Sequence, residues 1–328
     1  MRFLVTGATG FIGSNLCNKL LSRGHLVTGL YRNMANLPPV IPEGLKFVKG
    51  DILDYASVCE AAGGCDGIFH TAAFTGIGAR NHEMIRHVIV DGTLNVIRAA
   101  LDNGVKKIVV TSTAGVLGPS MESPVNEDTV RTSDFFIPYE SAKAEAELKA
   151  LEFAGKGTEV TIVSPTRVYG PGPLNKANSV TGIMKMYLEG KWRFNIGDGS
   201  SAGNYVFVED VSEGHILAME KGLNGEKYLL GGENVTYNEF FSLLAELTGK
   251  RLRLINIPVT VAMAAARMSM LLSAITGKDP FMTPGHVKRY ACNWNISSAK
   301  AREALGYRIT PLREGMKKTL DWLRTQTI

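Results

Sequence analysis

The chain has 328 residues, of which 45% are hydrophobic and 20% are charged, and its formal net charge is +5. This composition is typical of a folded globular protein and excludes a disordered or collagen-like chain. The basic residues form no run of five or six like charges, which argues against a nucleic-acid-binding arm. We therefore expect a globular protein with no nucleic-acid partner.

Short apolar runs alternate with helix-length segments through the first half of the chain. This alternation predicts an α/β fold with a doubly wound parallel sheet and helices on both of its faces. The expected strands are 2–6, 26–31, 45–49, 67–71, 107–111 and 159–164, and the expected helices are 12–22, 56–62, 85–103 and 139–155.

The pattern changes after residue 164, where prolines and glycines interrupt the chain. We therefore predict a dinucleotide-binding domain over residues 1–164 and a smaller, mostly helical substrate-binding lobe over 165–328. The segment 204–231, with strand-like runs at 204–208 and 227–231, is expected to return to the first domain.

The most apolar segment, 259–275, carries Arg267 near its centre. Because an arginine at the middle of a bilayer costs about 2.5 to 3.5 kcal/mol, we expect a packed or pocket-lining helix and no integral membrane segment. Contact with a membrane surface or an apolar substrate is the alternative interpretation. The start of the chain shows no signal-peptide pattern, and the four cysteines have neither zinc-site nor disulfide-scaffold spacing. These features predict a cytoplasmic protein with reduced thiols.

A glycine-rich turn follows the first expected strand. Its glycines are Gly7, Gly10 and Gly13, and they are interleaved with Thr9, Phe11 and Ile12. Such glycines allow a sharp turn and a close approach of a pyrophosphate to free N–H groups at a helix N-terminus. A glycine triplet alone is a weak signal, but its position at the first strand-to-helix turn predicts a dinucleotide site.

The residues about 20 positions further on bear on the choice of cofactor. An NAD site needs a carboxylate there for the adenosine ribose, whereas an NADP site needs a cation for the 2′-phosphate. The second expected strand is followed by Arg32, and no acidic residue occurs before Glu43. Because arginine offers a bidentate, permanently charged partner to a phosphate, the sequence favours NADP(H) over NAD(H), although a solvated surface arginine is the simpler interpretation of Arg32 alone.

Two further segments are expected beside the cofactor. Asp51 and Ile52 follow the third strand and would meet the adenine. Small residues follow the fourth strand and would let the dinucleotide lie close; they are Thr71, Ala72 and Ala73. His70, just before them, is interpreted as a positioning residue. No cluster of His, Cys, Asp or Glu has metal-ligand spacing, so no metal is expected.

Candidate catalytic residues lie on the fifth strand and on the helix after Pro138. Tyr139 and Lys143 are four residues apart, which places them on one helix face. A phenol has a pKa of about 10, and a nearby ammonium group lowers that pKa toward the neutral range needed for acid–base catalysis. Thr111 and Thr113 end the fifth strand, where open α/β sheets bind ligands and a hydroxyl can orient a substrate oxygen.

Taken in order, these motifs resemble those of the extended short-chain dehydrogenase/reductase family, in its dihydroflavonol-reductase-like branch, over nearly the whole chain. The resemblance implies a Rossmann-type fold, with Tyr139 as general acid/base and Lys143 as its modulator and ribose ligand. It implies Thr113 as the substrate-orienting hydroxyl, with Ser112 as second choice. It also places Pro165 and Val168 beside the nicotinamide. The chain departs from the family at Ile89, where the family has asparagine.

Further departures favour a reductase within that family. Dehydratases usually carry Asp-Glu after the active-site hydroxyl, whereas Ala114 and Gly115 stand here. Nucleotide-sugar epimerases usually carry Asn and Arg at the positions of Arg167 and Asn204. The absence of that second arginine weakens the case for a nucleotide-diphosphate substrate, although Arg167, Lys176 or Arg193 could take its place.

The predicted function is therefore NADP(H)-dependent hydride transfer to or from a ketone, aldehyde or alcohol. The apolar segments 184–187 and 259–275 suggest a small-molecule substrate with a hydrophobic body. Two alternatives remain open: a nucleotide-sugar or sugar epimerase that retains NAD, and a catalytically silent NADP-binding sensor or scaffold. In relatives the helices corresponding to 85–103 and 139–155 pair between subunits, which implies a homodimer.

Overall fold

The computed structural model describes residues 1–74 and 82–326. Within these residues, a parallel sheet of seven strands runs in the order β10-β6-β5-β4-β1-β2-β3. Its strands are β1 (Arg2–Thr6), β2 (Leu26–Tyr31), β3 (Leu45–Lys49), β4 (Gly67–His70), β5 (Lys107–Thr111), β6 (Glu159–Pro165) and β10 (Lys227–Leu230). The crossovers on either side of β1 make this a doubly wound sheet, so the predicted α/β fold is confirmed.

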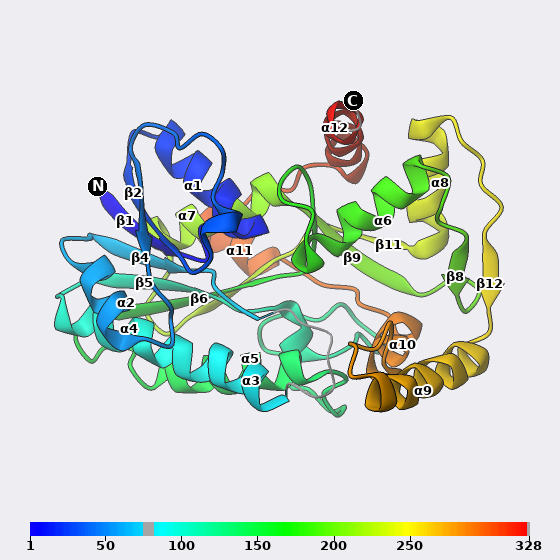
Figure 1. The fold of residues 1–328 in the computed structure, drawn as a ribbon, viewed down its shortest axis with the longest axis horizontal. Helices are drawn as coiled ribbons and strands as arrows, with labels where there is room; N and C mark the ends of the chain where they lie inside the picture. The colour runs from blue at the N-terminus through cyan, green and yellow to red at the C-terminus, as the bar shows by residue number, and fades with distance from the viewer. Residues whose placement is uncertain (75–81, 327–328) are drawn as a thin grey trace.

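Helices cover both faces of this sheet (Figure 1). One face packs against α1 (Phe11–Ser22), α7 (Val208–Lys221) and α11 (Ala299–Leu305). The other face packs against α2 (Tyr55–Ala62), α4 (Gly92–Asp102) and α5 (Pro138–Leu151). The expected helix 85–103 is divided into α3 (His82–Arg86), a π-helical turn (His87–Asp91) and α4. Ile89 is buried in that turn.

The C-terminal part adds two small sheets and further helices. One sheet has the order β11-β9-β7 and the other pairs β12 with β8. These strands are β7 (Arg167–Tyr169), β8 (Phe194–Ile196), β9 (Ala202–Phe207), β11 (Glu233–Thr236) and β12 (Ile255–Ile257). The helices are α6 (Ser179–Leu188), α8 (Tyr237–Thr248), α9 (Val259–Thr276), α10 (Pro284–Ala291) and α12 (Leu312–Thr325).

Of the two segments that were expected to join the main sheet, 204–208 and 227–231, only the second does so. β10 pairs with β6 in the main sheet, whereas β9 pairs with β7 and β11 in the small sheet, so the expectation is wrong for 204–208. Every residue of β9 is buried, as in a central strand, and its apolar pattern therefore could not distinguish the two sheets. The proposed domain boundary at residue 164 stays a prediction.

Helix α9 differs from the packed helix that was expected. It is the one helix in the described ranges that is long and apolar enough to cross a membrane, with a mean hydropathy of 1.5, yet only 17% of it is buried. The expectation of a packed helix is therefore wrong for most of its length. The pocket-lining part of the expectation is confirmed for Met270, which reaches the central cavity.

Candidate active site

A cavity of about 1100 Å³ is lined by the strand ends of the main sheet and by C-terminal helices. The structure brings together in its lining every residue that the sequence singled out for the cofactor or for catalysis. They are Gly7, Thr9, Gly10, Phe11, Ile12, Gly13, Arg32, Asp51, Ile52, Thr71, Ala72, Ala73, Thr111, Thr113, Tyr139, Lys143, Pro165 and Val168.

The glycine turn forms a cradle of backbone atoms. Gly7 has a φ of 71°, in the left-handed region that favours glycine. A Cβ on Gly13 would lie 2.1 Å from the carbonyl oxygen of Gly7, so no side chain fits there. Helix α1 begins at Phe11 with no side-chain cap, which leaves its first amide N–H groups available to an anion. This geometry fits the pyrophosphate of a dinucleotide.

Arg32 lies at the other end of the cofactor region. Its side chain is 67% exposed, and its Nη1 atom lies 3.7 Å from the Oδ2 atom of Asp51. Because this separation is long and the pair is exposed, the interaction contributes little stability and leaves the guanidinium able to bind a phosphate. Asp51 also accepts a hydrogen bond from the amide of Leu53 at 3.0 Å, which orients its carboxylate.

Tyr139 and Lys143 lie on the first turns of α5, and both line the cavity. Pro138 occupies the first turn of α5, where its missing N–H group costs nothing. The Nζ atom of Lys143 lies 6.0 Å from the ring centroid of Tyr139 and donates a hydrogen bond to the carbonyl of Thr111 at 2.6 Å. The lysine is thus attached to the end of β5, next to the candidate hydroxyls.

Burial changes the protonation of both groups. It raises the pKa of Tyr139 to about 12, an effect that the positive charge of Arg289 opposes. Burial also lowers the pKa of Lys143 to about 8, which Glu147 opposes. The charge that lowers the phenol pKa is therefore that of Arg289, a residue that the sequence patterns did not single out.

Two hydroxyl groups follow β5. Thr113 is half-buried and accepts a hydrogen bond from the amide of Gly115 at 3.2 Å, so its own hydroxyl hydrogen remains available for a substrate oxygen. Ser112 also lines the cavity, and its buried Oγ atom has no hydrogen-bond partner among the described residues. The structure therefore leaves both the first and the second choice of orienting hydroxyl open to a ligand.

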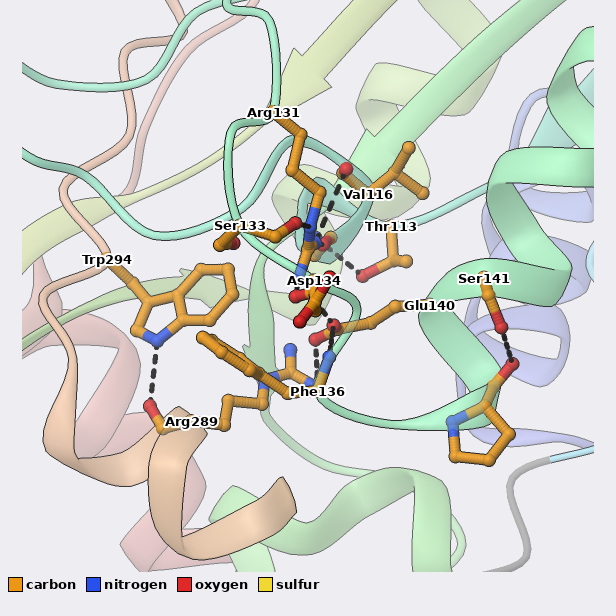
Figure 2. A network of polar contacts seen from close by, with 12 residues as sticks. Thr113, Val116, Arg131, Ser133, Asp134, Phe136, Glu140, Ser141, Arg289 and Trp294 are labelled. Atoms are coloured by element: carbon orange, nitrogen blue, oxygen red, sulfur yellow. Dashed lines mark hydrogen bonds and ion pairs between the residues drawn. The ribbon is translucent and has the colours of Figure 1, made fainter.

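Glu140, the residue after Tyr139, is the centre of a buried polar network (Figure 2). Its Oε2 atom accepts hydrogen bonds from Arg131 at 3.2 Å and from the amide of Phe136 at 3.1 Å. Its Oε1 atom lies 3.5 Å from Arg289. The network joins the start of α5 to α10, and Arg131 extends it to the loop after β5 by donating to the carbonyl of Gly115 at 2.6 Å.

A second arginine lies in the substrate end of the cavity. The guanidinium carbon of Arg167 lies 5.6, 5.1 and 5.7 Å from the ring centroids of Tyr205, Tyr237 and Tyr290. It donates to the hydroxyl of Tyr237 at 2.6 Å, and no carboxylate among the described residues forms a salt bridge with it. Burial raises the pKa of Tyr205 to about 12, so that ring is neutral, and Arg167 remains an uncompensated cation.

His70 does not line the cavity. It is buried between the hydroxyls of Thr6 at 2.8 Å and Thr93 at 3.0 Å. Burial lowers its pKa to about 3, so it is neutral and links β1, β4 and α4. This geometry agrees with a positioning role.

The apolar part of the cavity differs from the expected one. Met184 is buried elsewhere and Met186 is exposed, and neither lines the cavity. The apolar lining of the substrate end comes from Val180, Ile183, Phe240, Phe241 and Met270. Val180 and Ile183 of α6 line the cavity, whereas Met184 is buried in the core of the C-terminal part. Helical periodicity could not separate them, because these three positions lie on one face of the helix.

The chain matches the model of the NAD dependent epimerase/dehydratase family over residues 3–231. It is 29% identical to sterol demethylase protein B of Methylococcus capsulatus, over 99% of this chain and 98% of that protein. It is 27% identical to a Synechocystis protein with a provisional dihydroflavonol 4-reductase name, over 98% of this chain and 94% of that protein.

Among solved structures, the UDP-glucose 4-epimerase of Thermotoga maritima with UDP-glucose superposes with a TM-score of 0.80 at 26% identity, over 100% of both chains. The match of the family model, the doubly wound sheet and the glycine cradle agree with one another. The chain therefore belongs to the NAD-dependent epimerase/dehydratase family, within the extended short-chain dehydrogenases/reductases, whose members act with a nicotinamide cofactor.

Proposed function

We propose that the protein is an NADP(H)-dependent oxidoreductase that interconverts a ketone or aldehyde and the corresponding alcohol. The observation that carries this proposal is the convergence of Tyr139, Lys143 and Thr113 on the cavity that also contains the glycine cradle. A bound nicotinamide cofactor supplies or accepts the hydride. The protein residues bind and orient the reactants and move the proton.

Each catalytic residue has a role that its position supports. In the reductive direction the hydroxyl of Tyr139 donates its proton to the substrate oxygen as that oxygen gains negative charge. The hydroxyl of Thr113 donates a hydrogen bond to the same oxygen and orients it. Lys143 is charged below about pH 8 and would bind the nicotinamide ribose, whereas the charge of Arg289 stabilises the phenolate that remains.

The preference for NADP(H) rests on Arg32. Its exposed guanidinium lines the cofactor end of the cavity, where a 2′-phosphate would be bound. Asp51 lies beside it and competes for the same guanidinium, so the preference depends on a phosphate being the stronger partner. A phosphate carries more charge and more acceptor oxygens than a carboxylate, which favours that outcome.

A substrate with an apolar body fits the substrate end. Ile183, Phe240, Phe241 and Met270 line it, and a relative from Methylococcus capsulatus carries the name sterol demethylase protein B. Such a pocket binds a hydrocarbon skeleton through buried apolar area while a few polar groups fix its orientation.

Arg167 favours a second candidate, a nucleotide-sugar epimerase that retains NAD. This cation has no carboxylate partner among the described residues, and it would bind the diphosphate of a nucleotide sugar such as the one bound to the Thermotoga maritima epimerase. An epimerase would turn over without added nucleotide, whereas a reductase consumes NADPH.

Isothermal titration of the purified protein with NADPH and NADH tests the cofactor preference, with Arg32→Ala as the variant. We expect tighter binding of NADPH, and loss of that preference in the variant. A panel of apolar ketones and UDP-glucose then tests the reaction, with Tyr139→Phe as the variant. Full turnover by Tyr139→Phe would refute the assigned role. Retained NAD together with epimerisation of UDP-glucose would establish the second candidate instead.

A further inference from the structure

Helix α9 presents a row of apolar side chains to solvent. Figure 1 shows the helix at an edge of the molecule, away from the seven-stranded sheet, with α10 beside it. We call the exposed set the α9 surface; its members are Val261, Met268, Leu271, Leu272 and Ile275 on the helix and Phe281 in the loop that follows it. Ile275 and Phe281 are 82% and 87% exposed. Clustered exposure of this kind on a soluble protein marks an interaction site.

The opposite side of α9 is firmly packed. Ala262 and Ala266 are buried against Val287 of α10, with Ile257 of β12 beside them. The loop after the helix is attached by a hydrogen bond from the amide of Phe281 to the hydroxyl of Ser269 at 2.9 Å. The apolar side chains are therefore held outward by the fold.

Positive charge is concentrated in the same segment. Residues 250–290 contain seven of the 36 basic residues and one of the 31 acidic residues, which leaves 29 basic and 30 acidic residues in the rest of the chain. Arg267 on α9, Lys278 after it and Lys288 on α10 are exposed, and none forms a salt bridge within the described residues. The acidic residue, Asp279, is paired with Lys176. In the sequence, the excess of basic residues thus falls within 250–290, and three of these cations, Arg267, Lys278 and Lys288, lie on or beside α9.

The same helix also borders the candidate active site. Met270 lines the cavity, as do His286 and Arg289 of the packed α10, while Leu271 and Leu272, the next two residues of α9, face solvent. One helix therefore separates the cavity from the exposed apolar surface.

We propose that the α9 surface binds the surface of an anionic phospholipid bilayer, with α9 lying in the headgroup region. The apolar side chains would enter the boundary with the acyl chains, and Arg267, Lys278 and Lys288 would contact anionic headgroups. The helix lies on the membrane and does not span it, because its other side is packed against α10 and β12. A second copy of the chain fits this surface less well, because a symmetric contact would bring the same basic residues together.

The proposal goes beyond the proposed function, and one consequence rests on that function. An apolar substrate dissolved in the bilayer would reach the cavity past Met270 without crossing water. Membrane binding itself does not depend on which reaction the active site performs.

Flotation of the full chain with lipid vesicles tests the proposal. One set of vesicles contains phosphatidylcholine alone. The second set contains a mixture of phosphatidylcholine and phosphatidylglycerol. We expect binding to the anionic vesicles that weakens as sodium chloride is raised. Replacement of one exposed arginine, Arg267→Gln, is expected to weaken partitioning about 5-fold.

Ile275→Glu tests the apolar contribution, and Leu223→Glu, which adds the same charge at a leucine that is 65% exposed elsewhere, is the matched control. We expect Ile275→Glu to lose vesicle binding and Leu223→Glu to keep it, with NADPH affinity unchanged in both. Absence of wild-type binding to anionic vesicles would overturn the proposal. So would a wild-type dimer in light scattering that Ile275→Glu converts to a monomer, since a second copy would then cover the surface.

Discussion

Replacement of Lys143 by methionine should stabilise the cofactor-free protein while removing its activity. Burial lowers the pKa of Lys143 from 10.5 to about 8, a difference of about 2.5 units. At 1.36 kcal/mol per unit, the charged lysine destabilises the fold by about 3 kcal/mol at pH 7. The variant also loses the hydrogen bond from Lys143 to the carbonyl of Thr111, which destabilises it by about 1 kcal/mol. The net gain in the free energy of unfolding is therefore about 2 kcal/mol.

The stabilisation by Lys143→Met depends on pH. Below pH 8 the lysine is charged in both the folded and the unfolded chain, and the full cost of burying the charge is present. Between pH 8 and about 10.5 the folded protein releases the proton first, so the cost falls and the advantage of Lys143→Met disappears. Thermal unfolding at pH 7 should show a rise in Tm of about 3 °C for Lys143→Met over the wild type. A lower Tm at pH 7, or a difference that does not shrink by pH 10, would refute the reasoning.

Three further changes test other parts of the site. Gly13→Ala places a Cβ 2.1 Å from the carbonyl oxygen of Gly7 and should weaken NADPH binding by more than about 10-fold in a titration. The control is Gly182→Ala, at a helical position where a Cβ would have nothing within 4 Å, and it should leave the NADPH affinity unchanged. Glu140→Gln removes the carboxylate shared by Arg131 and Arg289 and should lower the free energy of unfolding, measured in urea, by about 3 kcal/mol. A loss below about 1 kcal/mol would show that the network contributes little to stability. Arg289→Met removes the charge that lowers the pKa of Tyr139, so the acid limb of the alcohol-oxidation rate should move to higher pH; an unmoved pH profile would contradict that role.

The sequence predicted most of the main sheet because each strand there is a short apolar run bounded by turn residues. The expected and observed bounds agree closely for β1, β2, β3 and β5. The cofactor cradle was equally predictable from the sequence, because the local backbone geometry requires glycine at positions 7 and 13. Local rules of this kind can be applied without knowing the tertiary structure.

The substrate end was less predictable because its contacts are long-range. Arg289 reaches Glu140 from a helix about 150 residues further along the chain, and Arg131 reaches it from an irregular loop nine residues before it, so no spacing rule connects them. Helix α9 was misjudged for a related reason, since an apolar helix can be buried or exposed and only the packing of Ala262 and Ala266 shows which side is covered.

The position of Arg167 differs from that of the arginine that epimerases usually carry at the substrate end of the cavity. Asn204, where epimerases usually have arginine, is buried and bonds Thr166, Gly232 and Asn234, so it cannot act on a substrate. The cation comes instead from the neighbouring strand β7, and its guanidinium lies over Gly203, where a Cβ would stand 2.6 Å from the Nη1 atom of Arg167. A cation held by aromatic rings at that place can bind an anionic group of a substrate, but its geometry differs from that of an arginine on β9. Because Tyr139 and Lys143 belong to α5 and not to these strands, we expect the exchange to affect substrate recognition and to leave the proposed proton transfer unchanged.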